Sequence, residues 1–196
     1  MVVKAISTAA LSVRQWPEPG AWTYQDYQDL PDDGYRYEII CGELYMSPAP
    51  NTGHQLTSGE LEYALQSFVR QRELGTVLHA PCDLILPGGS PVQPDILFVS
   101  KTGNAIITPE AVRGAPDLII EILSPSNADH DRERKYNLYE QAGVVEYWLV
   151  DPQARTIEIF GLANEAYTLA GKFESGQTAV SQALSGFTVQ VDEVLV

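Results

Sequence analysis

A carboxylate inside an apolar strand is the most informative feature of this chain. Glu121 lies within the segment Asp117-Leu-Ile-Ile-Glu-Ile-Leu-Ser124, which is otherwise apolar between its ends. Because a buried and unpaired carboxylate is costly, Glu121 needs a compensating partner. A divalent cation is one such partner, and a neighbouring lysine or arginine is another. The sequence therefore predicts a charged site on this strand.

A second carboxylate and a lysine could complete that site. Asp95 follows Pro94 at the start of another predicted strand. If the two strands are neighbours, Asp95 and Glu121 converge near one end of the sheet, where two carboxylates suit a hard cation such as Mg²⁺. The metal could activate water and neutralise charge on a phosphate. A nearby lysine, for which Lys135 is the candidate, could polarise the water or hold the phosphate.

Each of these residues also has an ordinary structural interpretation. Glu121 could be a half-buried acid paired with a lysine, and Asp95 could be a turn aspartate at a strand start. Lys135 could form an i,i+4 ion pair with Asp131 on an exposed helix face. His54, at the start of a predicted helix, is a cap-region residue or a site contributor, and Glu43 is exposed or a further site carboxylate.

Periodicity and turn residues indicate the elements that position these residues. We predict a hairpin over 35–46 with Gly42 in its turn, a short helix over 24–29 capped by Thr23, and a helix over 54–72 ended by Gly75. Strands are predicted at 76–86, 93–99, 117–123, 145–150 and 155–160, with a loop at 101–116. A helix should run from Ser126 or Asn127 to about Gln141. This order favours an α/β fold, with a mixed sheet flanked by helices.

Length and composition limit the class of protein. The 196 residues suit one domain, and we expect an N-terminal arm over 1–22 and a single domain over 23–196. No run approaches the roughly 18 apolar residues that span a bilayer. The pair Cys41 and Cys82 predicts reduced thiols in a cytoplasmic protein. The net charge of −14 disfavours non-specific adhesion to nucleic acid, so a DNA-binding role would need a local basic patch.

Several blocks of the sequence together resemble a known family. Pro94-Asp95 and Glu121-Ile-Leu123 look like the PD-(D/E)XK nuclease pattern of an Asp, a variable gap, and an acid two residues before a lysine. The wider set is similar to one restriction-endonuclease-like family within that superfamily, over roughly residues 24–192. The blocks that carry this resemblance are Glu43, Ser47-Pro48, His54, Pro94-Asp95, residues 115–126, 135–139 and 143–152.

The resemblance implies a restriction-endonuclease-like mixed sheet, with an N-terminal hairpin and arm, and a site in named roles. Asp95 and Glu121 carry over as ligands of Mg²⁺ or Mn²⁺, with the backbone carbonyl of Ile122 as a further ligand. The motif lysine position holds Leu123, and the resemblance places the lysine on the following helix, at Lys135. Glu43 and His54 are possible additional site residues.

Two functions are compatible with this pattern. The first is a metal-dependent endonuclease that hydrolyses DNA phosphodiester bonds and, by analogy with resembling enzymes, acts as a homodimer. The second is a nuclease-fold binding or regulatory module with weakened catalysis, which Leu123 and the net charge of −14 favour. A different carboxylate-pair hydrolase, such as a glycosidase, lacks a sugar-binding aromatic pattern in this sequence.

Overall fold

A six-stranded mixed sheet forms the centre of the molecule. The computed structural model describes residues 16–103, 106–124 and 130–195, and the strand order of the sheet is β12-β11-β10-β9-β6-β3. These strands are β3 (Gly75–His79), β6 (Ile96–Ser100), β9 (Leu118–Ile122), β10 (Glu146–Asp151), β11 (Thr156–Ala163) and β12 (Ala166–Glu174). Among the described strands of this sheet, β9 and β10 pair in parallel, and the other neighbours are antiparallel. The predicted mixed sheet is confirmed.

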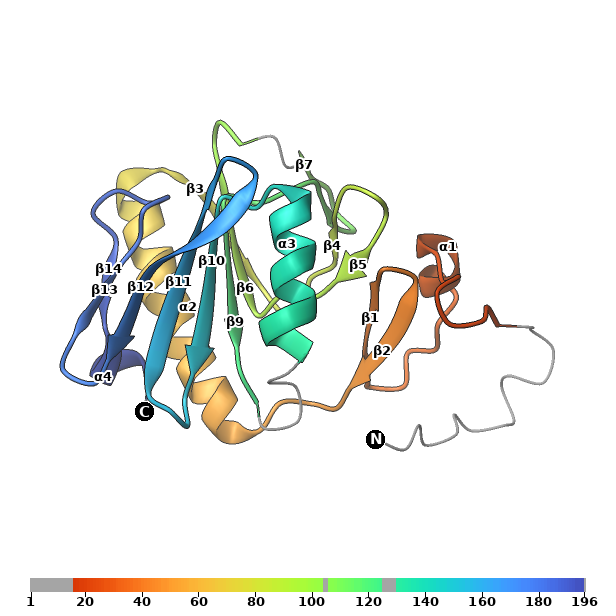
Figure 1. Cartoon of the computed structure of the whole chain (residues 1–196), viewed down its shortest axis with the longest axis horizontal. Helices are drawn as coiled ribbons and strands as arrows, with labels where there is room; N and C mark the ends of the chain where they lie inside the picture. The colour runs from red at the N-terminus through yellow and green to blue at the C-terminus, as the bar shows by residue number, and fades with distance from the viewer. Residues whose placement is uncertain (1–15, 104–105, 125–129, 196) are drawn as a thin grey trace.

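Helices cover both faces of this sheet. The long helix α2 (Thr52–Arg72) packs on one face, and α3 (Tyr136–Ala142) packs on the other (Figure 1). The alternation of β9 serves both layers. Its residues Leu118, Ile120 and Ile122 join the α2 side, whereas Ile119 joins the α3 side. The strand is therefore buried on both faces, as expected at the middle of a covered sheet.

A separate two-stranded hairpin stands beside the sheet (Figure 1). Strands β1 (Arg36–Ile40) and β2 (Glu43–Ser47) are joined by Cys41 and Gly42, whose φ angles of 52° and 77° both lie in the left-handed region. A two-residue turn of this kind matches the twist of the strands. The predicted hairpin is confirmed.

The chain before the hairpin is attached to its turn. The backbone N–H groups of Gly20 and Trp22 both donate to the carbonyl of Gly42, at 2.9 and 3.0 Å. Helix α1 (Tyr24–Gln28) follows, and Thr23 caps it through the predicted side chain, with Asp26 completing a capping box. Residues 1–15 of the expected arm lie outside the described residues, so the boundary at residue 22 stays a prediction.

Two predicted segments are wrong in part. The single strand over 76–86 is broken after His79, because Pro81 has no N–H to donate to a ladder. The loop over 101–116 contains two short strands. These belong to a second sheet, in the order β5-β4-β8-β7. Its strands are β4 (Leu84–Ile85), β5 (Pro91–Val92), β7 (Ile106–Ile107) and β8 (Val112–Arg113).

The helix boundaries differ from the expected ones in physically simple ways. Helix α2 begins at Thr52, two residues before the predicted start at His54, and Asn51 caps it. Glu73 ends the helix in a left-handed conformation, and Gly75 opens β3. The helix before Gly143 begins, within the described residues, as the π-helical segment η1 (His130–Lys135), which continues into α3. Its predicted start at Ser126 or Asn127 lies outside the described residues.

The C-terminal segment closes the α2 side of the sheet. It contains β13 (Thr178–Val180), β14 (Thr188–Gln190) and α4 (Val191–Val194), and its residues Phe187, Val189 and Val191 are buried in the core. Cys41 and Cys82 are free thiols, as predicted. Within the described ranges, no helix is long and apolar enough to cross a membrane.

Candidate active site

The register of the central sheet brings Asp95 and Glu121 together. Ile96 of β6 lies opposite Ile120 of β9 in an antiparallel pair. The residue before Ile96, Asp95, therefore lies beside the residue after Ile120, Glu121. Side chains of directly opposite residues leave the same face of an antiparallel pair. Both carboxylates line one pocket of about 270 Å³, together with His54, Ile122 and Lys135. We call it the carboxylate pocket.

Asp95 is held by three different kinds of donor. Its Oδ1 accepts from the Arg36 guanidinium, with Nη1 at 3.2 Å and Nη2 at 3.3 Å. Its Oδ2 accepts from the backbone N–H of Ile122 at 2.9 Å and lies 3.0 Å from His54 Nε2. Burial acts to raise the pKa of Asp95, but the hydrogen bond of His54 and the charges of His54, Lys135 and Arg36 outweigh it, so the pKa is lowered. Asp95 is therefore an ionised carboxylate at neutral pH.

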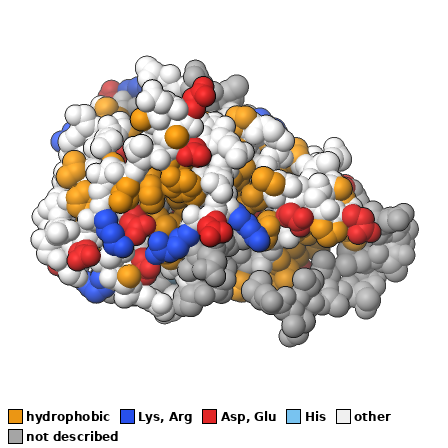
Figure 2. All heavy atoms as spheres, viewed as in Figure 1, with side chains coloured by type: hydrophobic (Ala, Val, Ile, Leu, Met, Phe, Trp, Pro, Cys, Tyr) orange, Lys and Arg blue, Asp and Glu red, His pale blue; other side chains and the backbone are white. Residues whose placement is uncertain are grey.

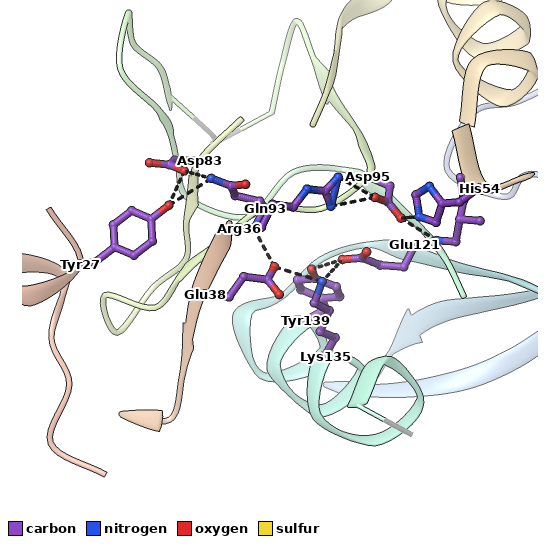
Figure 3. A network of polar contacts seen from close by, with 11 residues as sticks. Tyr27, Arg36, Glu38, His54, Asp83, Gln93, Asp95, Glu121, Lys135 and Tyr139 are labelled. Carbon is purple, nitrogen blue, oxygen red and sulfur yellow. Dashed lines mark hydrogen bonds and ion pairs between the residues drawn. The ribbon is translucent and has the colours of Figure 1, made fainter. Parts of the chain in front are cut away.

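Glu121 is paired with the predicted lysine. Lys135 Nζ lies 3.0 Å from Glu121 Oε1, and the Tyr139 hydroxyl donates to the same oxygen at 2.6 Å (Figure 3). Burial and then the negative charges of Glu121 and Glu38 raise the pKa of Tyr139 well above its usual value. The tyrosine therefore stays protonated and remains a donor to Glu121.

Lys135 faces this pocket and not solvent. It is 5% exposed, and it bridges Glu121 and Glu38, with Nζ also 3.0 Å from Glu38 Oε1. Surface placement against Asp131 is therefore wrong for Lys135, although the side chain of Asp131 lies outside the described part. Lys135 ends the π-helical segment η1, and π-helical turns are frequent at functional sites. The lysine thus reaches Glu121 from a helix that packs on the same sheet face.

His54 lies in the cap of α2 and also lines the carboxylate pocket. Its backbone N–H donates to the Asn51 side chain in the cap of α2, at 2.9 Å, while its ring contacts Asp95. Since Asp95 is ionised, Nε2 is the nitrogen that carries a proton towards it. His54 Nδ1 is buried and, among the described residues, has no hydrogen-bond partner.

Two hairpin residues that were not predicted from the sequence line the carboxylate pocket, and one that was considered, Glu43, does not. Arg36 and Glu38 both line the carboxylate pocket, and they lie two positions apart on β1, so they share one face of the strand. That alternation of charged residues in a predicted strand was the available signal. Glu43 lies opposite Ile40 at the turn end of the hairpin and is not among the residues that line the pocket.

The donor chemistry of the pocket fits a hard divalent cation. Asp95 and Glu121 offer carboxylate oxygens, and the carbonyl of Ile122 points to the same side as its N–H, towards Asp95. Mg²⁺ is usually bound by one or two carboxylates while it keeps several waters. Among the described residues, no group of three or more His, Cys, Asp or Glu is arranged to hold a metal, so a cation here would depend on this small set.

The basic residues outside the pocket do not gather into a patch on the face that Figure 2 shows. Lys and Arg side chains alternate there with Asp and Glu side chains. Arg132 pairs with two acids, Asp151 at 3.1 Å and Glu158 at 3.4 Å. The charge of Arg132 is therefore balanced by neighbouring acids.

Comparisons with known proteins agree with this architecture. Residues 24–192 match the family model described as "Uma2: Putative restriction endonuclease". A crystal structure described as a "putative nuclease belonging to DUF820" from Anabaena variabilis superposes with a TM-score of 0.74 at 19% sequence identity, covering 89% of this chain and 97% of the other. At that identity the likeness shows the fold, which is restriction-endonuclease-like. No curated protein matches the chain. Because the family model spans most of its length, the protein belongs to the Uma2 family, which supports a nuclease-like function.

Proposed function

We propose that this protein is a metal-dependent endonuclease that hydrolyses phosphodiester bonds of DNA. One observation carries the proposal: the carboxylates of Asp95 and Glu121 leave facing strand positions into one pocket, with the Lys135 ammonium 3.0 Å from Glu121. Family membership supports the same chemistry. A carboxylate pair with an adjacent ammonium suits attack of water on a phosphate, because the charges of the ligands and of the transition state are then balanced.

The residues divide between holding the cation and holding the phosphate. Asp95, Glu121 and the Ile122 carbonyl would hold Mg²⁺ or Mn²⁺, which when bound supplies a Lewis acid and an activated water. Lys135 donates to the attacking water or to a phosphate oxygen, since it is the ammonium that reaches this pocket. His54 orients Asp95, and Tyr139 orients Glu121.

The swap from Leu123 to Lys135 is compatible with this assignment. Leu123 is buried in the apolar cluster on the α3 side and contributes packing there. A lysine from η1 reaches the same glutamate without placing its aliphatic chain in that cluster. The ammonium is thus present although the motif position is apolar.

A second function is a nuclease-fold binding module with weakened catalysis. The observation that favours it is the internal neutralisation of the site: Arg36 occupies Asp95 Oδ1, and Lys135 is shared between Glu121 and Glu38. The net charge of −14 also opposes binding to DNA. A cytoplasmic location and a homodimer stay predictions under both functions.

Purified full-length protein tests the first function directly. Plasmid and linear DNA are incubated with Mg²⁺, with Mn²⁺ or with EDTA, and cleavage should require a divalent cation. Asp95→Asn and Lys135→Met should each abolish it, because the first removes a ligand charge and the second removes the ammonium. Lys101→Met is the matched control, since Lys101 is 61% exposed and pairs with Glu73 at 3.5 Å, away from the pocket.

The possible outcomes separate the two functions. Cleavage that survives in Asp95→Asn would remove the endonuclease assignment. Absence of cleavage in the wild type, combined with Mn²⁺ binding that Asp95→Asn abolishes in calorimetry, would favour the weakened module.

A further inference from the structure

Strand β1 brings two opposite charges into the carboxylate pocket. Arg36 donates through both terminal nitrogens to Asp95 Oδ1, at 3.2 and 3.3 Å. Glu38 Oε1 lies 3.0 Å from Lys135 Nζ (Figure 3). Each charge of the hairpin therefore contacts one of the groups to which the proposed reaction assigns a task.

The signs of these contacts match the signs of the incoming groups. A guanidinium on Asp95 places positive charge where a divalent cation would bind. A carboxylate on Lys135 places negative charge where a phosphate would bind. Both hairpin residues compete for their partners by the same electrostatic attraction that substrate and cation would use.

We propose that Arg36 and Glu38 hold the free site in a neutralised state from which the ligands must displace them. A divalent cation displaces the guanidinium from Asp95, and a substrate phosphate takes the Lys135 ammonium from Glu38. The identity of the two incoming groups rests on the proposed function. Arg36 and Glu38 are positioning residues in this scheme, and each lowers the affinity of the site for one of its ligands.

Arg36 also lines a second pocket, which contains the carboxylate of Glu62. A side pocket of about 190 Å³ adjoins the carboxylate pocket, and both are lined by Arg36, His54 and Asp95. Glu62 lines this side pocket, is 27% exposed and lies 3.5 Å from His79 Nε2. The Arg36 side chain is 25% exposed, so its guanidinium can turn from Asp95 towards Glu62 without breaking a fully buried pair.

Glu38 is fixed more firmly than Arg36. Its side chain is 8% exposed, and its Oε1 also accepts from the backbone N–H of Gln93 at 2.8 Å. The moving group at this contact is therefore the Lys135 ammonium, which can leave Glu38 and remain beside Glu121. The hairpin itself need not open.

The cation half of the proposal is tested by calorimetric titration of the full-length protein with Mn²⁺ in the absence of DNA. Arg36→Met should bind Mn²⁺ about tenfold more tightly, because the affinity no longer includes loss of a charge-assisted hydrogen bond. Arg36→Lys keeps the charge but loses the two-pronged contact, and it should lie between the two. Equal Mn²⁺ affinity of wild type and Arg36→Lys would mean that charge repulsion alone acts, and it would overturn the displacement of Arg36 from Asp95. Unchanged Mn²⁺ affinity in folded Arg36→Met would overturn it as well.

Glu62 provides a control that depends on Arg36. Glu62→Gln should weaken Mn²⁺ binding when Arg36 is present, because the displaced guanidinium loses its alternative partner. The same change should have no effect in the Arg36→Met background. An effect of equal size in both backgrounds would overturn the role of the side pocket.

The phosphate half is tested by fluorescence anisotropy of a labelled DNA duplex in EDTA, where no cleavage can occur. Glu38→Gln should bind the duplex about tenfold more tightly than Glu158→Gln, a matched loss of one negative charge at an acid that pairs with Arg132 and Lys172. Equal binding by the two variants would overturn this half.

The binding measurements are independent of cleavage, so the two proposals can fail separately. Tighter Mn²⁺ and DNA binding without any cleavage would retain the neutralised site and remove the endonuclease. Metal-dependent cleavage with unchanged binding in these variants would retain the endonuclease and remove the neutralised site.

Discussion

Two buried glutamates on neighbouring strands have opposite kinds of surroundings. Glu121 of β9 and Glu146 of β10 are 2% and 1% exposed, and the two strands pair in parallel. Glu146 is satisfied by neutral donors. Its Oε1 accepts from Trp148 Nε1 at 2.6 Å and from the Ser181 hydroxyl at 2.7 Å. Its Oε2 accepts from the backbone N–H groups of Gln182 and Ala183, at 2.6 and 2.9 Å.

Glu121 is held by a cation and opens onto a pocket. Lys135 and Tyr139 contact one of its oxygens, and the side chain lines the carboxylate pocket. The comparison teaches that burial alone does not mark a functional carboxylate. Fixed dipoles that fill every lone pair indicate a structural role, whereas an exchangeable ion pair beside a cavity leaves room for a ligand.

Replacing each glutamate by glutamine should have the largest effects and should separate the roles of the two residues. Glu121→Gln should lower metal-dependent DNA cleavage at least about 10³-fold, because a ligand charge is lost, while the protein remains folded at the assay temperature. Glu146→Gln should instead lower the free energy of unfolding by about 3 kcal/mol, because the amide NH₂ then faces backbone N–H donors. Cleavage assays well below the melting temperature, together with thermal and urea unfolding, measure both effects.

Either of two results would contradict this distinction. Wild-type cleavage by Glu121→Gln would remove Glu121 from the site. Loss of cleavage by folded Glu146→Gln would show that Glu146 acts in the reaction, or that the loop over 181–183 supports the pocket.

The dependence of the free energy of unfolding on pH should distinguish a buried aspartate from an exposed one. The pKa of Asp95 is lowered from 3.8, so its contribution to stability is fully present above pH 3.8 and is lost as the pH falls through the folded pKa. Asp95→Asn should therefore be less stable than wild type by about 2 kcal/mol at neutral pH, and the two should converge in acid. Chemical unfolding between neutral pH and acid measures the difference.

Asp192 is the matched control for this measurement. Its pKa is also lowered, first by the hydrogen bond of Arg155 and then by the backbone N–H of Gly176, but its side chain is exposed. Because solvent screens such a pair, Asp192→Asn should give a much smaller pH-dependent difference. An equal difference for both variants would mean that the burial of Asp95 adds nothing to its ion pairs.

The placement of Glu121, Asp95 and Lys135 in one pocket could be predicted from the sequence. An apolar strand with one glutamate is a local signal, whereas the pairing of β6 with β9 was a condition of the prediction and is observed in the structure. The position of Lys135 needed the family resemblance, because periodicity does not state which face of a later helix meets the sheet. The reaction in which these residues take part stays a proposal.

Other features depend on contacts between segments that are distant in the sequence. Arg36 reaches Asp95 only because the hairpin docks at the end of the sheet, a tertiary event without a periodic signature. The role of Glu146 has no signal within its own strand, because three of its four donors come from the distant loop over 181–183. Strands of two residues, such as β7 and β8, are too short to show an alternation.

A single hydroxyl beside each glutamate allows the smallest and most closely matched test. Tyr139→Phe removes a 2.6 Å donor from Glu121, and Ser181→Ala removes a 2.7 Å donor from Glu146. Each should lower the free energy of unfolding by about 1–3 kcal/mol, because a hydrogen bond to a buried charge is lost. Urea unfolding measures this common effect.

Of the two hydroxyls, only that of Tyr139 should affect Mn²⁺ binding and cleavage. Without its hydroxyl, Glu121 keeps the Lys135 contact but loses a fixed orientation, so Mn²⁺ affinity and cleavage should fall several-fold in Tyr139→Phe and remain unchanged in Ser181→Ala. Calorimetry and cleavage assays under conditions where both variants are folded provide the measurement. Both variants could instead lose Mn²⁺ affinity in proportion to their loss of unfolding free energy. A general destabilisation of the sheet would then explain both results, and the two glutamates would differ in their partners but not in their function.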